Sequence, residues 1–443
     1  MFNFNEELVA LANAHRAQVD EDYKKTYEAV GNSDAVYKGK QLPYLYFPAV
    51  YSEEDVLNFE KLTKRIFEIV NKSIDIYFNH PEVRSVWGFD SRLEELILLP
   101  HRFNAKVPMG RFDFFYYEDG SYKFCELNTD GTSAMNEETP LTDILTNTFV
   151  LNKFKENHQI KRYELYQSWV DEVKSIYEEY VQNGGTRTEI PHLIIMDYMS
   201  KGSPHEFEAF KKYFNANGFK CQIVSPDELT EADGVLYYNG EKIDIIYRRL
   251  VTRDLMEHYD DLEPLINGIK ANKTCIIGSI KSQVVHTKKY FEALHHPLVR
   301  KYFTEEELEY IDAHIPYTSS LSGTDSFEKY VENKDMYIVK PIDYYASKGV
   351  YAGKEFDREA WIALLEKAAD EGCIIQEFCP KSINKNLDFS GEGTFKVAEY
   401  NNITGVFVYN EKMKGIFTRA GFNAVISDLN DGFSLSSIVA SPL

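Results

Sequence analysis

Residues 111–140 read RFDFFYYEDGSYKFCELNTDGTSAMNEETP, and this stretch predicts a β-hairpin. Aromatic residues at every second position of 112–116 alternate with Asp113 and Phe115, as in a strand with one buried face. The Glu-Asp-Gly sequence at 118–120 is typical of a tight turn, and residues 122–127 then read as the returning strand. We expect the rest of the chain to be organised around this hairpin.

Polar side chains on the hairpin form two pairs. Residues two apart on a strand share a face, so Arg111 should project beside Asp113, and Glu126 beside Asn128. Two carboxylates and an amide carbonyl are hard oxygen ligands, which suit Mg²⁺ carrying nucleotide phosphates better than a softer metal. An arginine beside them is able to neutralise a phosphoryl group. The sequence therefore predicts a magnesium site formed by Asp113, Glu126 and Asn128.

A simpler interpretation is an edge hairpin whose outer face merely carries charges, and for any one of these residues it is the better one. The grouping favours the metal site. Glu126 and Asn128 interrupt an otherwise apolar strand. Residues 129–133, TDGTS, then add a run of small hydrogen-bonding residues, which a solvated face does not need.

Composition and charge exclude several classes of protein. The 443 residues are 44% hydrophobic, 14% aromatic and 27% charged, as in a globular chain of two or three lobes. A net charge of −21 argues against binding nucleic acid. No apolar run approaches the roughly 20 residues of a membrane span, and the N-terminus does not read as a signal peptide, so we expect a cytoplasmic protein without a membrane partner. The five cysteines lack CxxC spacing, so no zinc site or disulfide framework is predicted.

Helix and strand patterns predict an α/β fold with four regions. In the first, Ser52 begins a capping box that opens a long helix, and His80-Pro81 ends it. The third contains a small parallel α/β unit and a hairpin of residues 235–238 and 243–247 around Asn239-Gly240. It has no GxGxxG motif, which argues against a dinucleotide site. The regions are 1–100 (mostly helical), 101–150 (hairpin and loop), 151–272 (helix and small α/β lobe) and 273–443 (alternating strands and helices).

A lysine ends a buried strand in the last region. Residues 336–340, MYIVK, finish at Lys340, and a buried ammonium needs a partner. That partner is either phosphate oxygens or a nearby carboxylate, and the sequence alone does not decide between them. The loop 346–353 then contains Ser347 and Gly349 and is able to lay backbone N–H groups over phosphates. Arg419 taken by itself reads as a surface residue.

Taken together, these segments resemble glutathionylspermidine synthetases, specifically the synthetase part, an ATP-grasp carboxylate–amine ligase in circularly permuted order. The family's arginine-x-aspartate and glutamate-x-asparagine pairs resemble those at 111–113 and 126–128. The metal-binding pairs precede the phosphate lysines, whereas ordinary ATP-grasp enzymes have the lysines first. The similarity continues through the family's two nucleotide lysines, its adenine-contacting strand and its late arginine with a short apolar strand, which correspond to Lys288, Lys340, 375–378, Arg419 and 424–426.

The resemblance implies an ATP-grasp fold, circularly permuted, with a small Rossmann-like pre-ATP-grasp lobe. It implies that ATP and Mg²⁺ bind between two lobes, that the γ-phosphate passes to a carboxylate, and that an amine attacks the acyl phosphate to give an amide. The implied roles are charge stabilisation (Arg111, Arg419), metal binding (Asp113, Glu126, Asn128), ATP binding (Lys288, Lys340, Ser347, Gly349, Gln376, Glu377, Phe378, Val425, Ile426) and orientation of the acid substrate (Asp130, Gly131, Thr132, Ser133).

The acid and amine stay open, and a peptide or a polyamine is compatible with the family. Gly131 stands where the family has Ser or Thr, and residues 247–250, YRRL, replace a more typical Trp- and Lys-rich stretch. Two other functions remain as alternatives. One is a catalytically silent nucleotide-binding or regulatory protein that kept the shape. The other is a kinase-like phosphotransferase that uses the same site with a different acceptor.

Overall fold

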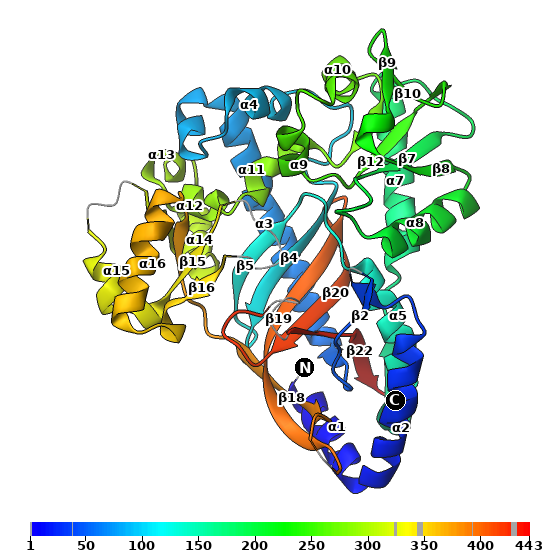
Figure 1. Ribbon diagram of the computed structural model, residues 1–443, viewed down its shortest axis with the longest axis vertical. Coiled ribbons are helices and arrows are strands. Elements are labelled where there is room, and N and C mark those ends of the chain that lie inside the picture. Colours follow the sequence, from blue (N-terminus) through cyan, green and yellow to red (C-terminus); the bar gives the residue numbers. More distant parts are fainter. Residues whose placement is uncertain (1, 38, 323–325, 343–348, 392, 427–431) are drawn as a thin grey trace.

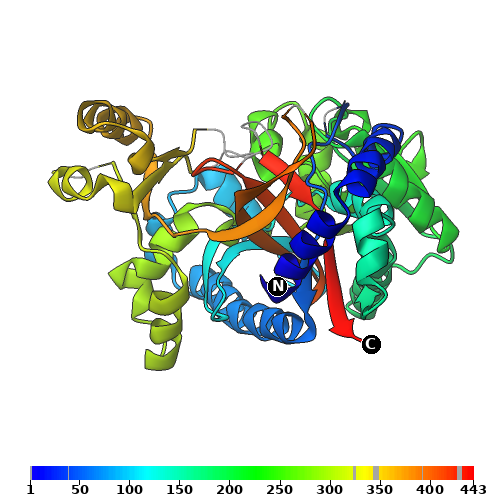
Figure 2. The same ribbon diagram turned by 90° about the horizontal axis from the view of Figure 1, so that it is seen from below.

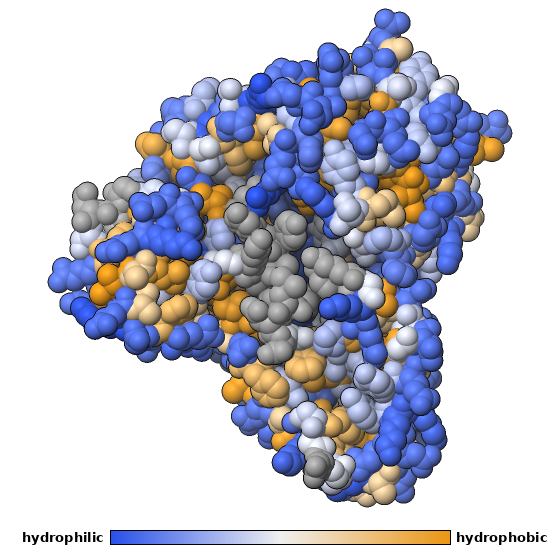
Figure 3. Space-filling view, viewed as in Figure 1, coloured by the Kyte–Doolittle hydropathy of each residue, from blue (hydrophilic) through white to orange (hydrophobic). Residues whose placement is uncertain are grey.

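A computed structural model describes the chain except for residues 1, 38, 323–325, 343–348, 392 and 427–431. Ser347 therefore lies outside the described residues. Figure 1 shows a central sheet with an α/β unit at one end, a smaller lobe at one side, and helices α1 (Phe2–Ala14) and α2 (Arg16–Gly31) at the other end. The expected mixture of helices and sheets is confirmed. On the face in Figure 3, hydrophilic residues cover most of the rim.

The central sheet joins the predicted hairpin to the end of the chain. Strands β4 (Met109–Tyr116) and β5 (Tyr122–Asn128) pair antiparallel, so the predicted hairpin is confirmed. β4 also pairs with β19, and the strand order is β21-β20-β19-β4-β5, with β18 paired to β19. The hairpin and the C-terminal strands therefore form one surface. The partner strands are β18 (Ser382–Asp388), β19 (Lys396–Tyr409), β20 (Lys412–Gly421) and β21 (Gly432–Leu435).

Helix α3 (Glu53–Asn79) covers one face of this sheet (Figure 2). It begins with the predicted capping box at Ser52 and ends with His80 as its C-cap. The Phe59 ring contacts Phe114 of β4, with ring centroids 5.3 Å apart. Because alternate side chains of a strand point to opposite faces, Arg111 and Asp113 project away from α3. The packing of α3 thus fixes which side of the sheet carries the polar residues.

A β-bulge at Cys125 decides which residues of β5 join that polar side. Asp113 lies opposite Glu126, whereas the next residue, Phe114, lies opposite Phe124. Cys125 is thus an extra residue on β5, and the alternation of β5 changes phase there. Upstream of it Phe124 faces the core, and downstream Glu126 faces the same side as Asp113. The bulge is what brings the two predicted carboxylates together.

The predicted parallel unit is confirmed, and the predicted hairpin inside it is only partly correct. The parallel strand order is β13-β12-β7-β8. β10 (Val235–Tyr238) turns at Asn239-Gly240 but pairs only with the short β11 (Glu241–Lys242) and with β9. β12 (Ile245–Arg248) instead enters the parallel sheet, because its apolar run is buried on both faces. The other elements are α7 (Leu165–Gln182), β7 (His192–Met196), α8 (Pro204–Ala216), β8 (Lys220–Val224), β9 (Thr230–Ala232), α9 (Thr252–Glu257), α10 (Glu263–Ala271) and β13 (Cys275–Ile277).

The C-terminal lobe has the strand order β14-β17-β15-β16, and its strands pair antiparallel. The strand expected at 424–426 is absent from this described segment, which forms bends after β20. Its backbone is bonded to side chains instead, because the Ala424 carbonyl accepts from Lys381 and the Ala424 N–H donates to Glu355. The elements of the lobe are α11 (Gln283–His286), α12 (Lys289–His295), α13 (Pro297–Arg300), α14 (Glu305–His314), β14 (Thr318–Ser320), α15 (Glu328–Glu332), β15 (Tyr337–Lys340), β16 (Tyr351–Ala352), α16 (Arg358–Asp370) and β17 (Ile374–Glu377).

A small three-stranded sheet ties the N-terminal region to the C-terminus. β22 pairs parallel with β3 and antiparallel with β6. No helix within the described ranges has both the length and the apolar character needed to cross a membrane. The proposed division into four regions stays a prediction, although the central sheet runs through two of them. The remaining elements are β1 (Val36–Tyr37), β2 (Lys40–Gln41), β3 (Ala49–Ser52), α4 (Ser91–Ile97), α5 (Met135–Leu145), α6 (Phe149–Phe154), β6 (His158–Lys161) and β22 (Ser437–Pro442).

Candidate active site

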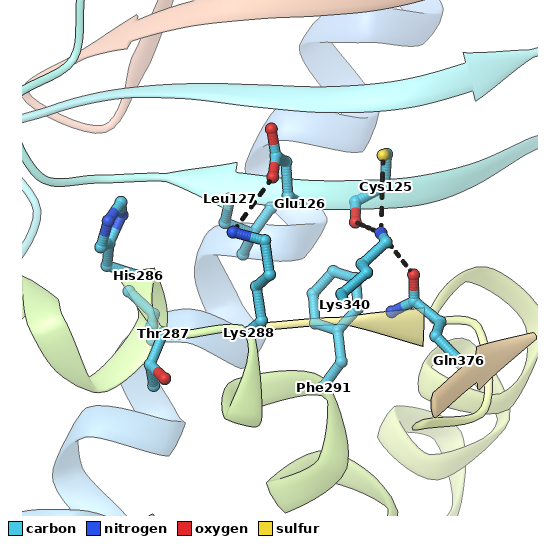
Figure 4. Close-up of a pocket in the computed structure, with 10 residues that line it drawn as sticks. Cys125, Glu126, Leu127, His286, Thr287, Lys288, Phe291, Lys340 and Gln376 are labelled. Atoms are coloured by element: carbon cyan, nitrogen blue, oxygen red, sulfur yellow. Dashed lines mark hydrogen bonds and ion pairs between the residues drawn. The ribbon is translucent and has the colours of Figure 1, made fainter. Parts of the chain in front are cut away.

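A pocket of about 680 Å³, counting its open mouth, lies where the central sheet meets the C-terminal lobe. Strands β5, β15, β17 and β20 each supply a polar side chain, and its apolar residues belong to two small hydrophobic clusters. A narrower hollow continues from it along β5 (Figure 4). The pocket is lined by Phe115, Cys125, Glu126, Lys288, Ile338, Lys340, Val350, Gln376, Glu377, Phe378, Cys379, Lys381, Ile403, Arg419, Ala424, Val425 and Ile426.

Lys340 reaches into this pocket from the end of β15. Its Nζ donates to Gln376 Oε1 over 2.7 Å and to the carbonyl oxygen of Cys125 over 3.3 Å. Within the described part of the chain it forms no direct ion pair, although it is close enough to Glu126 to lower the pKa of that carboxyl. A buried ammonium held by neutral acceptors keeps its full charge available for an anion. Lys340 is thus suited to bind phosphate oxygens.

Lys288 and Glu126 form the next pair along β5. Lys288 Nζ lies 3.8 Å from Glu126 Oε2. Burial would raise the pKa of Glu126, but Lys288 and Lys340 lower it to about 2. Burial also lowers the pKa of Lys381, which lines the same pocket, to about 8. Four basic side chains therefore face two acidic ones in the pocket of a protein whose net charge is −21. This local excess of positive charge favours an anionic ligand.

Arg111, Asp113 and Arg419 form a buried charge cluster beside the pocket. Nε and Nη2 of Arg111 donate to the two oxygens of Asp113 over 2.7 and 2.9 Å. Arg419 Nη2 donates to Asp113 Oδ2 over 3.1 Å. Burial would lower the pKa of Arg111, but Asp113 raises it, so the guanidinium stays charged. Two arginines share the Asp113 carboxylate here.

The three predicted metal ligands lie close together, because the side-chain amide of Asn128 contacts both carboxylates. Asn128 Nδ2 is 3.2 Å from both Asp113 Oδ2 and Glu126 Oε1. The orientation of an amide is assigned from its hydrogen bonds, so the nitrogen of Asn128 faces the carboxylates here. With a cation between the carboxylates, the amide oxygen would face them instead. Among the residues that the structure describes, no three His, Cys, Asp or Glu side chains group as a metal site, and the role of the Asn128 amide as a ligand stays a prediction. Asp113 is the least available of the three, because both its oxygens accept from arginines.

The loop after β5 is held by the α/β unit. Asp130 is buried and accepts from Arg248 Nη2 over 2.6 Å. Burial would raise the pKa of Asp130, but Arg248 lowers it. Gly131 has φ +57°, and a Cβ there would lie 2.9 Å from the Arg249 carbonyl oxygen and 2.5 Å from Val251. The two departures from the family pattern, at Gly131 and at 247–250, therefore lie against each other.

The rest of this loop supports the charge cluster. Thr132 Oγ1 donates to the Asn128 carbonyl over 2.9 Å, and the Ser133 carbonyl accepts from Arg111 Nη1 over 3.1 Å. None of the four residues expected to orient the acid substrate is among the described lining residues of the pocket. Thr132 contacts Asn128 and Ser133 contacts Arg111, whereas Asp130 and Gly131 lie against the α/β unit. Their contact with a substrate stays a prediction.

Half of the predicted site residues meet at this pocket although they come from distant segments. Gly349 lies one residue before the lining residue Val350, and Ser347 falls outside the described range. Sequence reasoning missed Lys381, His286 and Arg248. A signal existed for His286, two positions before Lys288, but none for Arg248, which pairs 118 positions away. Those in the lining are Glu126, Lys288, Lys340, Gln376, Glu377, Phe378, Arg419, Val425 and Ile426.

No protein-family model and no curated protein sequence matches this chain. Solved structures do match. A glutathione synthetase-like effector from Globodera pallida, in its apo form, superposes with a TM-score of 0.60 at 12% identity, covering 94% of this chain and 96% of the effector. This match shows a shared fold, and it confirms the expected mixed α/β fold at the level of a glutathione synthetase-like, ATP-grasp type. The circular permutation stays a prediction.

Two further structures match less well. A candidate gamma-glutamylcysteine synthetase from Methylobacillus flagellatus has a TM-score of 0.43 at 12% identity, and the match covers 90% of each chain. D-alanyl-alanine synthetase A from Vibrio cholerae has a TM-score of 0.29 at 11% identity, over 57% of this chain and 88% of that enzyme. Similarity this low carries no argument about function.

Proposed function

We propose that this chain is an ATP-dependent carboxylate–amine ligase that forms an amide through an acyl phosphate. The observation that carries the proposal is the pocket beside Glu126, which combines an excess of basic side chains with an adjoining apolar wall. A nucleoside triphosphate has the same division, because its base is flat and apolar and its phosphates are anionic. The glutathione synthetase-like fold supports the same proposal at the level of architecture.

ATP would bind with its base at the apolar side and its phosphates along the lysines. Phe378, Val425 and Ile426 supply apolar contacts for a base, and Gln376 lies beside them at the end of β17. Lys340 contacts Gln376, so it links this side of the pocket to β5. The phosphates would then extend along β5 toward Glu126. The partners in this proposal are small molecules, namely a carboxylate and an amine.

The residues fit a divalent cation in part. Glu126 lines the pocket and its Oε1 accepts from Asn128, whereas Asp113 would share its Oδ2 with Arg419. Mg²⁺ held by these side chains would offset the negative charge of a phosphoryl group. The protein's own part is to keep Glu126 ionised, which the neighbouring lysines do, and to hold Asp113 in place, which Arg111 does with two hydrogen bonds.

The reaction has two steps. The bond between the γ-phosphorus and the oxygen that leaves with ADP breaks, and a bond forms from that phosphorus to a carboxylate oxygen of the acid. The amine nitrogen then attacks the acyl carbon and loses a proton, and phosphate leaves. Arg419 faces the pocket and is the arginine able to contact the phosphoryl group. Arg111 lies behind Asp113 and acts by holding it.

Isotope transfer tests this proposal directly. The purified protein is incubated with Mg-ATP, pooled amines and pooled acids labelled with ¹⁸O in the carboxylate. An acyl phosphate requires one label to appear in the released phosphate, together with ADP. Label in AMP would indicate an adenylate instead and would refute the proposed intermediate.

A nucleotide-binding protein without turnover is the second candidate. It is favoured by one observation, namely that both oxygens of Asp113 already accept from Arg111 and Arg419. If that arrangement persists with nucleotide bound, Asp113 is not free to bind a metal. Mg-ATP would then raise the melting temperature without any ADP release across the substrate pools. A phosphotransferase would release ADP but form no amide.

A further inference from the structure

His286 extends the row of polar groups that faces β5. It ends α11 (Gln283–His286) and lines the narrower hollow together with Lys288 and Glu126 (Figure 4). The contacts follow the order of the strand. Lys340 contacts Cys125, Lys288 contacts Glu126, and His286 contacts Thr129, the first residue after β5. His286 therefore stands at the end of the row that is farthest from Gln376.

The contact with Thr129 fixes which ring nitrogen of His286 is able to donate. The Thr129 N–H donates to His286 Nδ1 over 3.3 Å. A nitrogen that accepts from a backbone N–H carries no proton, so in the neutral ring the proton is on Nε2. Thr129 is also held independently, because its Oγ1 donates to the Ser282 carbonyl over 3.0 Å and its carbonyl accepts from Ser282 Oγ over 2.8 Å. The backbone donor is thus fixed even without the imidazole.

We infer that Nε2–H of His286 donates a hydrogen bond to the terminal phosphoryl group of ATP. The inference rests on the proposed function, because the base end of the pocket sets the direction of the phosphates. A nucleotide that starts near Gln376 passes Lys340 and then Lys288, so the group that reaches His286 is the last phosphate. The donor stays on the ring, and no proton is transferred. His286 is in this sense a residue that distinguishes a triphosphate from a diphosphate.

Two substitutions separate this role from a structural one. In His286→Asn the amide lies near the position of Nδ1, so the acceptor for Thr129 is kept and the donor at Nε2 is lost. In His286→Gln the amide nitrogen reaches the position of Nε2, so the donor is kept and the acceptor is lost. The two variants differ from each other by one methylene group. The Asn amide replaces the acceptor Nδ1, and the Gln amide replaces the donor Nε2.

Calorimetric titration with Mg-ADP and with the non-hydrolysable Mg-AMP-PNP tests the inference. Hydrogen bonds to charged groups correspond to losses on the order of tenfold to a hundredfold in affinity. We expect His286→Asn to lose about that much affinity for AMP-PNP and little for ADP, and His286→Gln to retain most of both. If His286→Gln loses more than His286→Asn, or if both nucleotides weaken equally, the donor role is wrong.

Thermal melts without ligand complete the test, because a purely structural His286 would lower the melting temperature in His286→Gln and spare His286→Asn. Failure of the underlying proposal is distinguishable. If the unsubstituted protein binds neither ADP nor AMP-PNP, the nucleotide site itself is refuted. If it binds both and neither variant discriminates between them, only the role of His286 is refuted.

Discussion

Substitution of Gly405 in β19 tests the charge cluster without replacing any charged residue. It lies opposite Asp113 in the sheet. A Cβ at position 405 would lie 2.5 Å from Asp113 Oδ1 and 3.2 Å from Cγ and Cδ of Arg111. An ordinary carbon–oxygen contact is roughly 3.3 Å or longer. In Gly405→Ala the Asp113 carboxylate must therefore turn away and give up its 2.7 Å bond from Arg111 Nε.

The magnitude follows from that lost contact. A hydrogen bond between charged groups contributes about 1.5–3 kcal/mol, so we expect Gly405→Ala to lower the free energy of unfolding by a similar amount. Urea unfolding followed by tryptophan fluorescence measures it. Gly391→Ala is the matched control, since its Cβ would meet nothing within 4 Å and its φ is not positive. That control should change stability by less than about 1 kcal/mol.

A double-mutant cycle identifies the cause. Asp113→Ala alone leaves two buried arginines without their carboxylate and should cost about 3–5 kcal/mol. In that background the methyl group of Gly405→Ala has no Oδ1 to displace, so the second substitution should add little. An equal cost of Gly405→Ala in both backgrounds, or no cost in the native one, would show that Gly405 is not shaped by Asp113.

Three further outcomes follow from the same contacts. Glu126→Gln should lower the free energy of unfolding at neutral pH, because a depressed pKa stabilises only the ionised form of Glu126. The difference from the native protein should shrink as the pH falls from about 4.3, an ordinary Glu pKa, toward the native pKa of about 2. Urea unfolding from pH 7 to 3 measures this difference. Lys340→Met should abolish the stabilisation by Mg-ATP in thermal melts while leaving the ligand-free melting temperature nearly unchanged. Arg248→Met should cost about 3–5 kcal/mol by leaving Asp130 buried and unpaired, and adding Asp130→Asn should restore much of it; equal stabilities of the single and double variants would contradict the pairing.

The hairpin and the helix boundaries could be predicted from the sequence because their causes are local. Alternating aromatic residues and a Glu-Asp-Gly turn determine the strands, and the capping residues determine the ends of α3. The approach of Lys288, Lys340 and Arg419 to Glu126 had no local cause, and it was anticipated only through the resemblance to a family. The expected strand at 424–426 was wrong for a related reason, since side chains from 355 and 381 bind its backbone.

The contacts of the loop after β5 show the same limit. Nothing near Asp130 in the sequence indicates that its partner is Arg248. The signal that did exist was indirect, because Gly131 and the stretch 247–250 both depart from the family pattern. In this structure the two segments lie against each other, since a side chain at 131 would collide with the backbone at Arg249.

The bulge at Cys125 is the feature on which the site depends most and which the sequence indicates least. With regular alternation, Phe124, Glu126 and Asn128 would all face α3, and both metal ligands would be buried in the core. The extra residue reverses the phase, so that Phe124 stays in the core while Glu126 meets Asp113. The carbonyl of the extra residue, Cys125, also accepts from Lys340. One inserted residue thus creates both the carboxylate pair and the anchor of the first lysine, and deleting Cys125 should remove Mg-ATP binding altogether even if the strand still forms.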